Sequence, residues 1–109
     1  MTMNDIESGS GSRLPKVVDT LTRHRDELSR KHVNHLWVFG SVARGDENDG
    51  SDVDLLVEID PKSHMSLTGF SSLRLDLIEL LGQDVDLGEW STLKEDMVED
   101  VRNDAVMVF

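Results

Sequence analysis

The stretch that decides the fold, residues 36–59, reads LWVFGSVARGDENDGSDVDLLVEI. It begins with four apolar residues that stop at Gly40, which is typical of a buried strand followed by a tight turn. Its last eight residues, 52–59, alternate between two faces, with most apolar side chains on one face and Asp52 and Asp54 on the other. The stretch therefore predicts two strands joined by a turn and an acidic loop, with two carboxylates on one face of the second strand.

Asp52 and Asp54 are candidate metal ligands, because side chains two residues apart on a strand project together, roughly 7 Å apart. Two carboxylates this close raise one another's pKa unless a cation lies between them. Mg²⁺ prefers oxygen ligands from one or two carboxylates, substrate phosphates and water. A third acid, Asp86, lies in a second alternating segment, 84–87, and would complete a site for two Mg²⁺ ions.

Gly40 and Ser41 are the candidates for contact with phosphate groups. A glycine at the end of a buried strand lets the backbone turn sharply and approach a ligand closely. If Ser41 begins a short helix, its hydroxyl and the backbone N–H groups face outward toward phosphate oxygens. Arg44 follows in the same segment, where it either adds positive charge beside a triphosphate or braces the acidic loop, and the bracing role is favoured.

Apolar residues at helical spacing predict two helices on either side of these strands. The first is expected to end near His32, with Ser12 as its cap and Pro15 in its first turn. The second follows the alternating strand and is expected to stop at Gly82. Trp37, in the first strand, is expected in the core rather than as a platform for stacking a base.

The last part of the chain predicts a helix and a strand. Thr92 and Glu95 have the spacing of a capping box for that helix, and residues 106–109 are apolar enough for a short edge strand. Together the segments predict an α/β (α+β) domain over 13–109, with a small mixed sheet of three to four strands, helices packed on one face and an acid-lined face left open. The polar residues 1–12 predict a flexible arm.

The composition limits the partners of this domain. The chain has 109 residues, enough for one modest core, and 22 acidic against 11 basic residues give a formal net charge of −11. Such a charge disfavours binding to bulk DNA or RNA and favours a basic partner. The chain has no cysteine, which excludes disulfides and thiol chemistry, and its uninterrupted apolar runs are short. We therefore expect a cytoplasmic protein that does not enter the membrane.

The motif formed by Gly40-Ser41, ten residues and Asp52-Val53-Asp54 resembles the hallmark of the DNA polymerase β-like nucleotidyltransferase superfamily. The fuller string GSVARGDENDGSDVDLLVEID, with DVDL further along the chain, is similar to the minimal nucleotidyltransferase (MNT) group. The resemblance implies the nucleotidyltransferase fold, ATP as nucleotidyl donor, and the glycine–serine pair at the phosphates.

The resemblance also implies a role for each acid. Asp52 and Asp54 would hold metal, and Asp86 would assist metal binding and deprotonate the acceptor. Asp84 is the alternative to Asp86 as the third ligand.

Small proteins of the MNT group are often antitoxins whose partner toxin is a HEPN-domain ribonuclease, and some transfer AMP from ATP onto a tyrosine of that toxin. The resemblance therefore implies a protein adenylyltransferase whose acceptor is supplied by a partner. One alternative is an antitoxin without catalysis that masks its partner sterically. Another is a transferase acting on a small molecule, for which a homo-oligomer could build a pocket across its interface.

Overall fold

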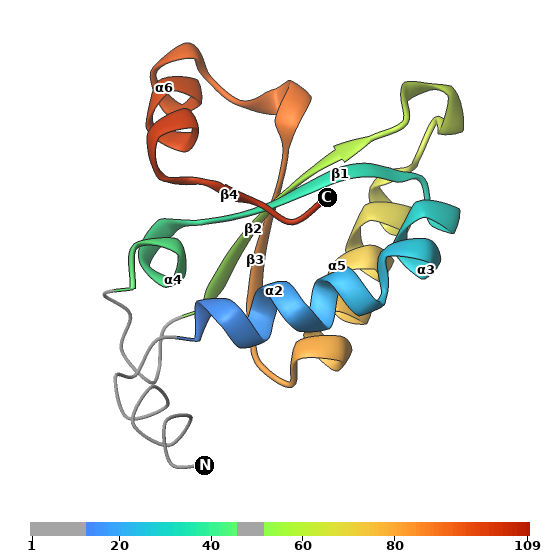
Figure 1. Ribbon diagram of the computed structural model, residues 1–109. Helices are drawn as coiled ribbons and strands as arrows, with labels where there is room; N and C mark the ends of the chain where they lie inside the picture. Colours follow the sequence, from blue (N-terminus) through green and yellow to red (C-terminus); the bar gives the residue numbers. More distant parts are fainter. Residues whose placement is uncertain (1–12, 46–51) are drawn as a thin grey trace.

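The computed structural model describes residues 13–45 and 52–109, which form a mixed sheet with helices packed around it (Figure 1). The elements in chain order are α2 (Leu14–Arg23), α3 (Arg25–Arg30), β1 (Val33–Phe39), α4 (Gly40–Arg44), β2 (Val53–Ile59), the 3-10 turn η1 (Pro61–Ser63), α5 (Leu67–Leu81), β3 (Val85–Glu89), the 3-10 turn η2 (Trp90–Thr92), α6 (Glu95–Asp104) and β4 (Val106–Met107). The predicted α/β (α+β) class is confirmed. The arm predicted at 1–12 lies outside the described residues.

Three helices, α2, α3 and α5, lie together against the sheet, whereas α6 lies away from them, beside α4 and β4 (Figure 1). The strictly alternating pattern predicted for 52–59 is confirmed, because the apolar side chains of β2 on the helix-covered face are almost all fully buried. The core joins these helices to three strands and to α4 through Val17, Leu21, Leu28, Val33, Leu36, Val38, Val42, Val53, Leu55, Val57, Leu73, Leu77 and Val85.

The first helix was predicted as one piece, and the structure divides it at His24. That residue leaves helical geometry, with φ −101° and ψ 16°, so α2 ends at Arg23 and α3 follows. Side chains next to the break bond the backbone, since Thr22 Oγ1 donates to the Val18 carbonyl and His24 Nδ1 lies 2.8 Å from the Thr20 carbonyl. Such local bonds compete with a continuous helix. Pro15 lies in the first turn as predicted, and Ser12, the predicted cap, is outside the described residues.

The second long helix, α5, stops at Gly82 as its sequence predicts. Ser66 caps its N-terminus by accepting a hydrogen bond from the backbone N–H of Gly69 at 3.0 Å. Gly82 ends the helix with φ +69°, in the left-handed region that glycine adopts without steric cost.

The strand order in the sheet is β3-β2-β1-β4. β1 is antiparallel to both β2 and β4, and β3 is parallel to β2. In the register, Phe39 lies opposite Asp54, and Asp54 lies beside Asp86. The end of β1 and the starts of β2 and β3 therefore meet at one edge of the sheet.

The face opposite these helices is less open than predicted. Trp37 was expected in the core, but it lies half-buried on this face and stacks on Trp90, with ring centroids 4.9 Å apart and an interplanar angle of 23°. Leu56, the cross-strand partner of Trp37, is fully buried on the same face. The alternation of β1 explains the error, because Leu36 and Val38 take the helix-covered positions and turn Trp37 to the other side.

The capping box predicted at Thr92 and Glu95 is wrong. Thr92 ends the turn η2, where its hydroxyl donates to the Glu89 carbonyl at 2.9 Å, and α6 begins three residues later with Lys94 as an N-cap that makes no side-chain bond. The predicted edge strand is confirmed as β4 beside β1. In the ranges 13–45 and 52–109, no helix combines the length and the apolar character needed to cross a bilayer.

Candidate active site

Gly40 and Asp54 are in direct contact at the edge where β1 ends and β2 begins. Gly40 has φ +71°, and a Cβ placed on it would overlap with Asp54 Oδ2 and lie 3.0 Å from Asp54 Cγ. Two independent constraints thus require glycine at this position: the left-handed backbone and the carboxylate lying against it. The tight turn that the sequence predicted from Gly40 is also what lets Asp54 lie against the start of α4.

Asp86 is the acid that the sheet brings to Asp54. Parallel pairing of β2 with β3 sets the two residues side by side on neighbouring strands, which are about 4.8 Å apart. Asp52 lies just before β2 and is exposed. Asp84 lies just before β3, where its carbonyl accepts a hydrogen bond from the Val53 N–H. The register therefore favours Asp86 over Asp84 as the neighbour of Asp54.

The Asp54 carboxyl is the electrostatically perturbed group of this edge. Burial raises the pKa of Asp54 above its ordinary value, and the negative charges of Asp86 and then Asp52 raise it further, while Arg44 opposes them. Ionising a half-buried carboxyl next to two other acids costs free energy unless a cation compensates the negative charge. Such a group is a candidate for function on physical grounds.

The described residues do not form a finished metal site. Among residues 13–45 and 52–109, no three His, Asp or Glu side chains converge closely enough to hold a metal ion. The three acids predicted as ligands therefore share one edge of the sheet without being drawn into a coordination group.

Ser41 and Arg44 both lie in the short helix α4, as the sequence predicted for this segment. Ser41 is half-buried in the first turn, directly after the Gly40–Asp54 contact. Arg44 is near the end of the helix, where its Nη1 lies 3.6 Å from Asp104 Oδ2 of α6, and both side chains are nearly half exposed. The loop that Arg44 was predicted to brace, 46–51, lies outside the described residues.

Comparison with known proteins adds to this geometry. A family model described as a nucleotidyltransferase domain matches residues 21–108. The chain belongs to the nucleotidyltransferase domain family. The activity class predicted from the sequence motif is thereby confirmed. The protein adenylyltransferase MntA of Thermococcus cleftensis is 38% identical to this nucleotidyltransferase over 96 residues, which cover 87% of this chain and 95% of the relative.

Solved structures share the fold of this nucleotidyltransferase. One is a protein assigned as a minimal nucleotidyltransferase, with 33% identity and a TM-score of 0.66 over 82% of this chain and 93% of that one. A chain of a toxin–antitoxin structure with AMP-PNP has 20% identity and a TM-score of 0.65, over 81% of this chain and 72% of that one. A chain of the complex between the tri-AMPylated Shewanella oneidensis HEPN toxin and its MNT antitoxin has 16% identity and a TM-score of 0.54, over 77% and 67% of the two chains. At these identities the last two show the fold alone.

Sequence reasoning missed two features of this nucleotidyltransferase near the site. One is the Trp37–Trp90 stack on the same sheet face as Asp54 and Asp86; the alternation around Trp37 could have revealed it. The other is the ion pair between Arg44 and α6, which no local pattern in the sequence signals because its partners are 60 residues apart.

Proposed function

We propose that this nucleotidyltransferase transfers AMP from ATP, with Mg²⁺ bound, onto a tyrosine hydroxyl of a partner HEPN-domain ribonuclease toxin, and acts as its antitoxin. The observation that carries the proposal is the Asp54 carboxylate, which lies against the Gly40 backbone and beside Asp86. A nucleotide held there would have its phosphates at a backbone turn and its reacting phosphorus beside two acids.

The donor set at this edge fits Mg²⁺ in its chemistry. Asp52, Asp54 and Asp86 offer carboxylate oxygens, the ligands that Mg²⁺ prefers, and their mutual repulsion is what a bound cation removes. A cation would have to draw these side chains closer together than they lie in the structure. When bound, Mg²⁺ would neutralise the triphosphate and the oxygens that attack and leave the phosphorus.

The remaining roles belong to residues of the chain itself. The backbone N–H groups and the hydroxyl at the Gly40–Ser41 turn would bind phosphate oxygens. Asp86 would accept the proton of the acceptor hydroxyl as that oxygen bonds to the α-phosphorus. The bond from the α-phosphorus to its bridging oxygen then breaks, and pyrophosphate leaves.

The identity of the acceptor rests on the relatives and on charge. The 38% identical relative is a protein adenylyltransferase, and a structural neighbour is a complex of an AMPylated HEPN toxin with an MNT antitoxin. A chain with a net charge of −11 is electrostatically complementary to a basic, RNA-cutting partner. The described domain is small, so the acceptor is best supplied by another protein.

The test is label transfer from α-labelled ATP. The protein is incubated with Mg²⁺ and a lysate of its own cells, beside an EDTA control and the Asp54→Asn variant. We expect a labelled protein band whose intensity falls at least about a hundredfold in the variant, which corresponds to roughly 2.7 kcal/mol in the barrier. The mass of the band identifies the acceptor.

The other outcomes distinguish the alternatives. Near-normal transfer by Asp54→Asn would refute the mechanism. No transfer at all, with the partner still bound and neutralised by an Asp52→Asn, Asp54→Asn double variant, would favour an antitoxin that masks its partner sterically. Label on a small molecule instead of a protein would favour a small-molecule transferase.

A further inference from the structure

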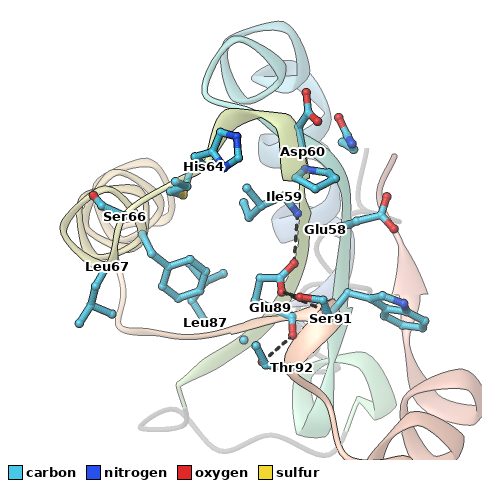
Figure 2. A pocket seen from close by; sticks show the side chains of 16 residues that line it. Glu58, Ile59, Asp60, His64, Ser66, Leu67, Leu87, Glu89, Ser91 and Thr92 are labelled. Atoms are coloured by element: carbon cyan, nitrogen blue, oxygen red, sulfur yellow. Dashed lines mark hydrogen bonds between the residues drawn. The ribbon is translucent and has the colours of Figure 1, made fainter.

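A concave site lies at the other end of β2 from the candidate active site. It is a cavity of about 830 Å³, bounded by the ends of β2 and β3, the turns η1 and η2 and the start of α5 (Figure 2). Ile59, on its far side, lies five residues beyond Asp54 on β2, which corresponds to about 17 Å at the usual rise per residue. None of the candidate active-site residues lines this cavity, although Leu87 in its lining directly follows Asp86 in the chain. The cavity is therefore a different site, and we call it the distal groove.

The floor of the distal groove is apolar. Ile59 is the last residue of β2, Leu87 lies in the middle of β3, and Phe70 comes from the first turn of α5. Leu67, at the rim, is 82% exposed, an unusual position for a large apolar side chain at the start of a helix. Figure 2 shows Leu67 on the α5 side of the groove, with Glu58 and Glu89 on the opposite side, where the strands end. An apolar side chain inserted into the groove would be stabilised by burying the apolar surface of Leu67 and of the floor.

Several of the polar groups that line the distal groove are already used by the protein's own turns and helix cap. Glu89 accepts hydrogen bonds from the backbone N–H groups of Ile59 at 3.3 Å and Ser91 at 3.0 Å, and from the Ser91 hydroxyl. Asp60 Oδ1 accepts from the Lys62 N–H at 3.0 Å, and Ser66 caps α5. Few directed polar groups remain to specify a small polar ligand, but the charges of the carboxylates remain.

The charge around the distal groove has one dominant sign. Its lining includes three carboxylates, Glu58, Asp60 and Glu89, with His64 as the further titratable side chain. No Lys or Arg of the described residues lines it; Lys62 belongs to the adjacent turn and is exposed. An apolar floor with an acidic rim complements an apolar side chain flanked by basic ones. A second copy of this chain, itself at −11, is a poor occupant because the two copies repel each other.

We propose that the distal groove docks a segment of the acceptor protein in which a large apolar side chain is flanked by Lys or Arg. This inference rests on the proposed function, because it takes the occupant to be the protein that receives AMP. Docking at this end leaves the edge with Asp54 and Asp86 accessible. A side chain docked beside Ile59 would then lie on the order of 17 Å along β2 from Asp54.

The test compares Leu67→Glu with Leu75→Glu. Both leucines lie on α5 and are exposed, 82% and 60%, but only Leu67 lines the groove. A glutamate is tolerated at the first position of a helix, where it complements the helix dipole, so Leu67→Glu is expected to fold. With the purified acceptor from the label-transfer experiment, we expect Leu67→Glu to raise the KM for the acceptor at least about tenfold, with kcat and the Kd for ATP unchanged. Leu75→Glu is expected to match the wild type, and an equal effect of both variants would overturn the proposal.

A second measurement does not depend on turnover. The photoreactive residue p-benzoylphenylalanine replaces Leu67 or Leu75 in the full chain carrying Asp54→Asn, and cells expressing it are irradiated. We expect a cross-link from position 67, and not from 75, to a protein whose attached peptide contains Lys or Arg beside an apolar residue, and which binds Leu67→Glu more weakly than Leu75→Glu. A cross-link to a second copy of this chain, the same products from both positions, or no product from either would overturn it. The cross-linked chain carries Asp54→Asn, so the cross-link does not depend on catalysis. A specific cross-link from position 67, together with no AMP transfer by the wild type, would therefore refute the proposed catalysis and not the docking site.

Discussion

The carboxylate of Asp54 lies against the backbone of Gly40, so that no side chain fits on Gly40 without displacing it. Asp54 comes early in β2 and Gly40 immediately follows β1, and antiparallel pairing of these strands brings the two together. One contact thus joins the turn expected to bind phosphate to the acid expected to bind metal. A substitution at either residue should therefore affect both phosphate binding and metal binding.

Gly40→Ala tests this contact. We expect the free energy of unfolding to fall by about 2 kcal/mol or more, since alanine adds both a strained backbone and an overlap with Asp54. Gly82→Ala is the matched control: Gly82 has a similar φ of +69° with nothing within 4 Å of its would-be Cβ, so about 1 kcal/mol is expected there. Urea unfolding measures both. Equal losses in the two variants would contradict an added cost from Asp54.

The third acid can be assigned by comparing two neutral variants. We expect Asp86→Asn to reduce nucleotidyl transfer at least about tenfold and Asp84→Asn to change it less than about threefold. The reason is register, because Asp86 lies beside Asp54 whereas Asp84 precedes β3. Initial rates of label transfer measure both. The reverse ranking would make Asp84 the third ligand.

The raised pKa of Asp54 predicts how its replacement changes stability with pH. In the unfolded chain Asp54 ionises near its ordinary value of 3.8, and in the folded chain it holds its proton to higher pH. Between the two pKa values the folded state binds more protons, so the contribution of Asp54 to stability falls as pH rises through that window and stays unfavourable above it.

In metal-free buffer near pH 7, Asp54→Asn is therefore expected to be more stable than the wild type by roughly 0.5–1 kcal/mol, a size typical of partly exposed charge interactions. The difference should shrink as pH falls toward 4. Urea unfolding of both proteins in EDTA between pH 4 and 8 measures it. A difference that grows on acidification would contradict the sign of the shift.

Arg44 is expected to act mainly through α6. Replacing Arg44 or Asp104 by alanine should each lower the free energy of unfolding by less than about 1 kcal/mol, because their ion pair is nearly half exposed. The Kd for ATP should rise less than about threefold in both variants. A rise of about tenfold or more for Arg44→Ala, with Asp104→Ala unaffected, would instead assign Arg44 to the triphosphate.

The stacked tryptophans are expected to stabilise the sheet face that carries the acids. Trp90→Ala should lower the free energy of unfolding by about 1–3 kcal/mol and change the near-UV circular dichroism of Trp37, its stacking partner. Trp90→Phe, which keeps an aromatic ring, should recover part of the loss. A stability equal to the wild type in Trp90→Ala would show that the stack contributes nothing.

Local chemistry explains which elements were predictable. The alternation over β2, the apolar stripe of α5 and its glycine stop depend on neighbours within a few residues, so their type and place could be read from the chain. The break at His24 and the start of α6 were missed because side chains there bond the backbone in ways that a hydrophobic pattern does not record. The position of Trp37 was missed because exposure of a strand face depends on what packs over it, and the ring that packs over it is 53 residues away.

The amino-acid sequence by itself determined the family, the Gly40-Ser41 turn and which acids are candidates for the site, because these are matters of residue type and spacing. Only the tertiary structure decided that Asp86 and not Asp84 stands beside Asp54, that Arg44 pairs with α6, and that a groove with an acidic rim forms between the end of β2 and the start of α5. Each of these depends on strand register or on contacts between distant elements. Those are set by how the whole core packs, and no short stretch of the chain contains that information.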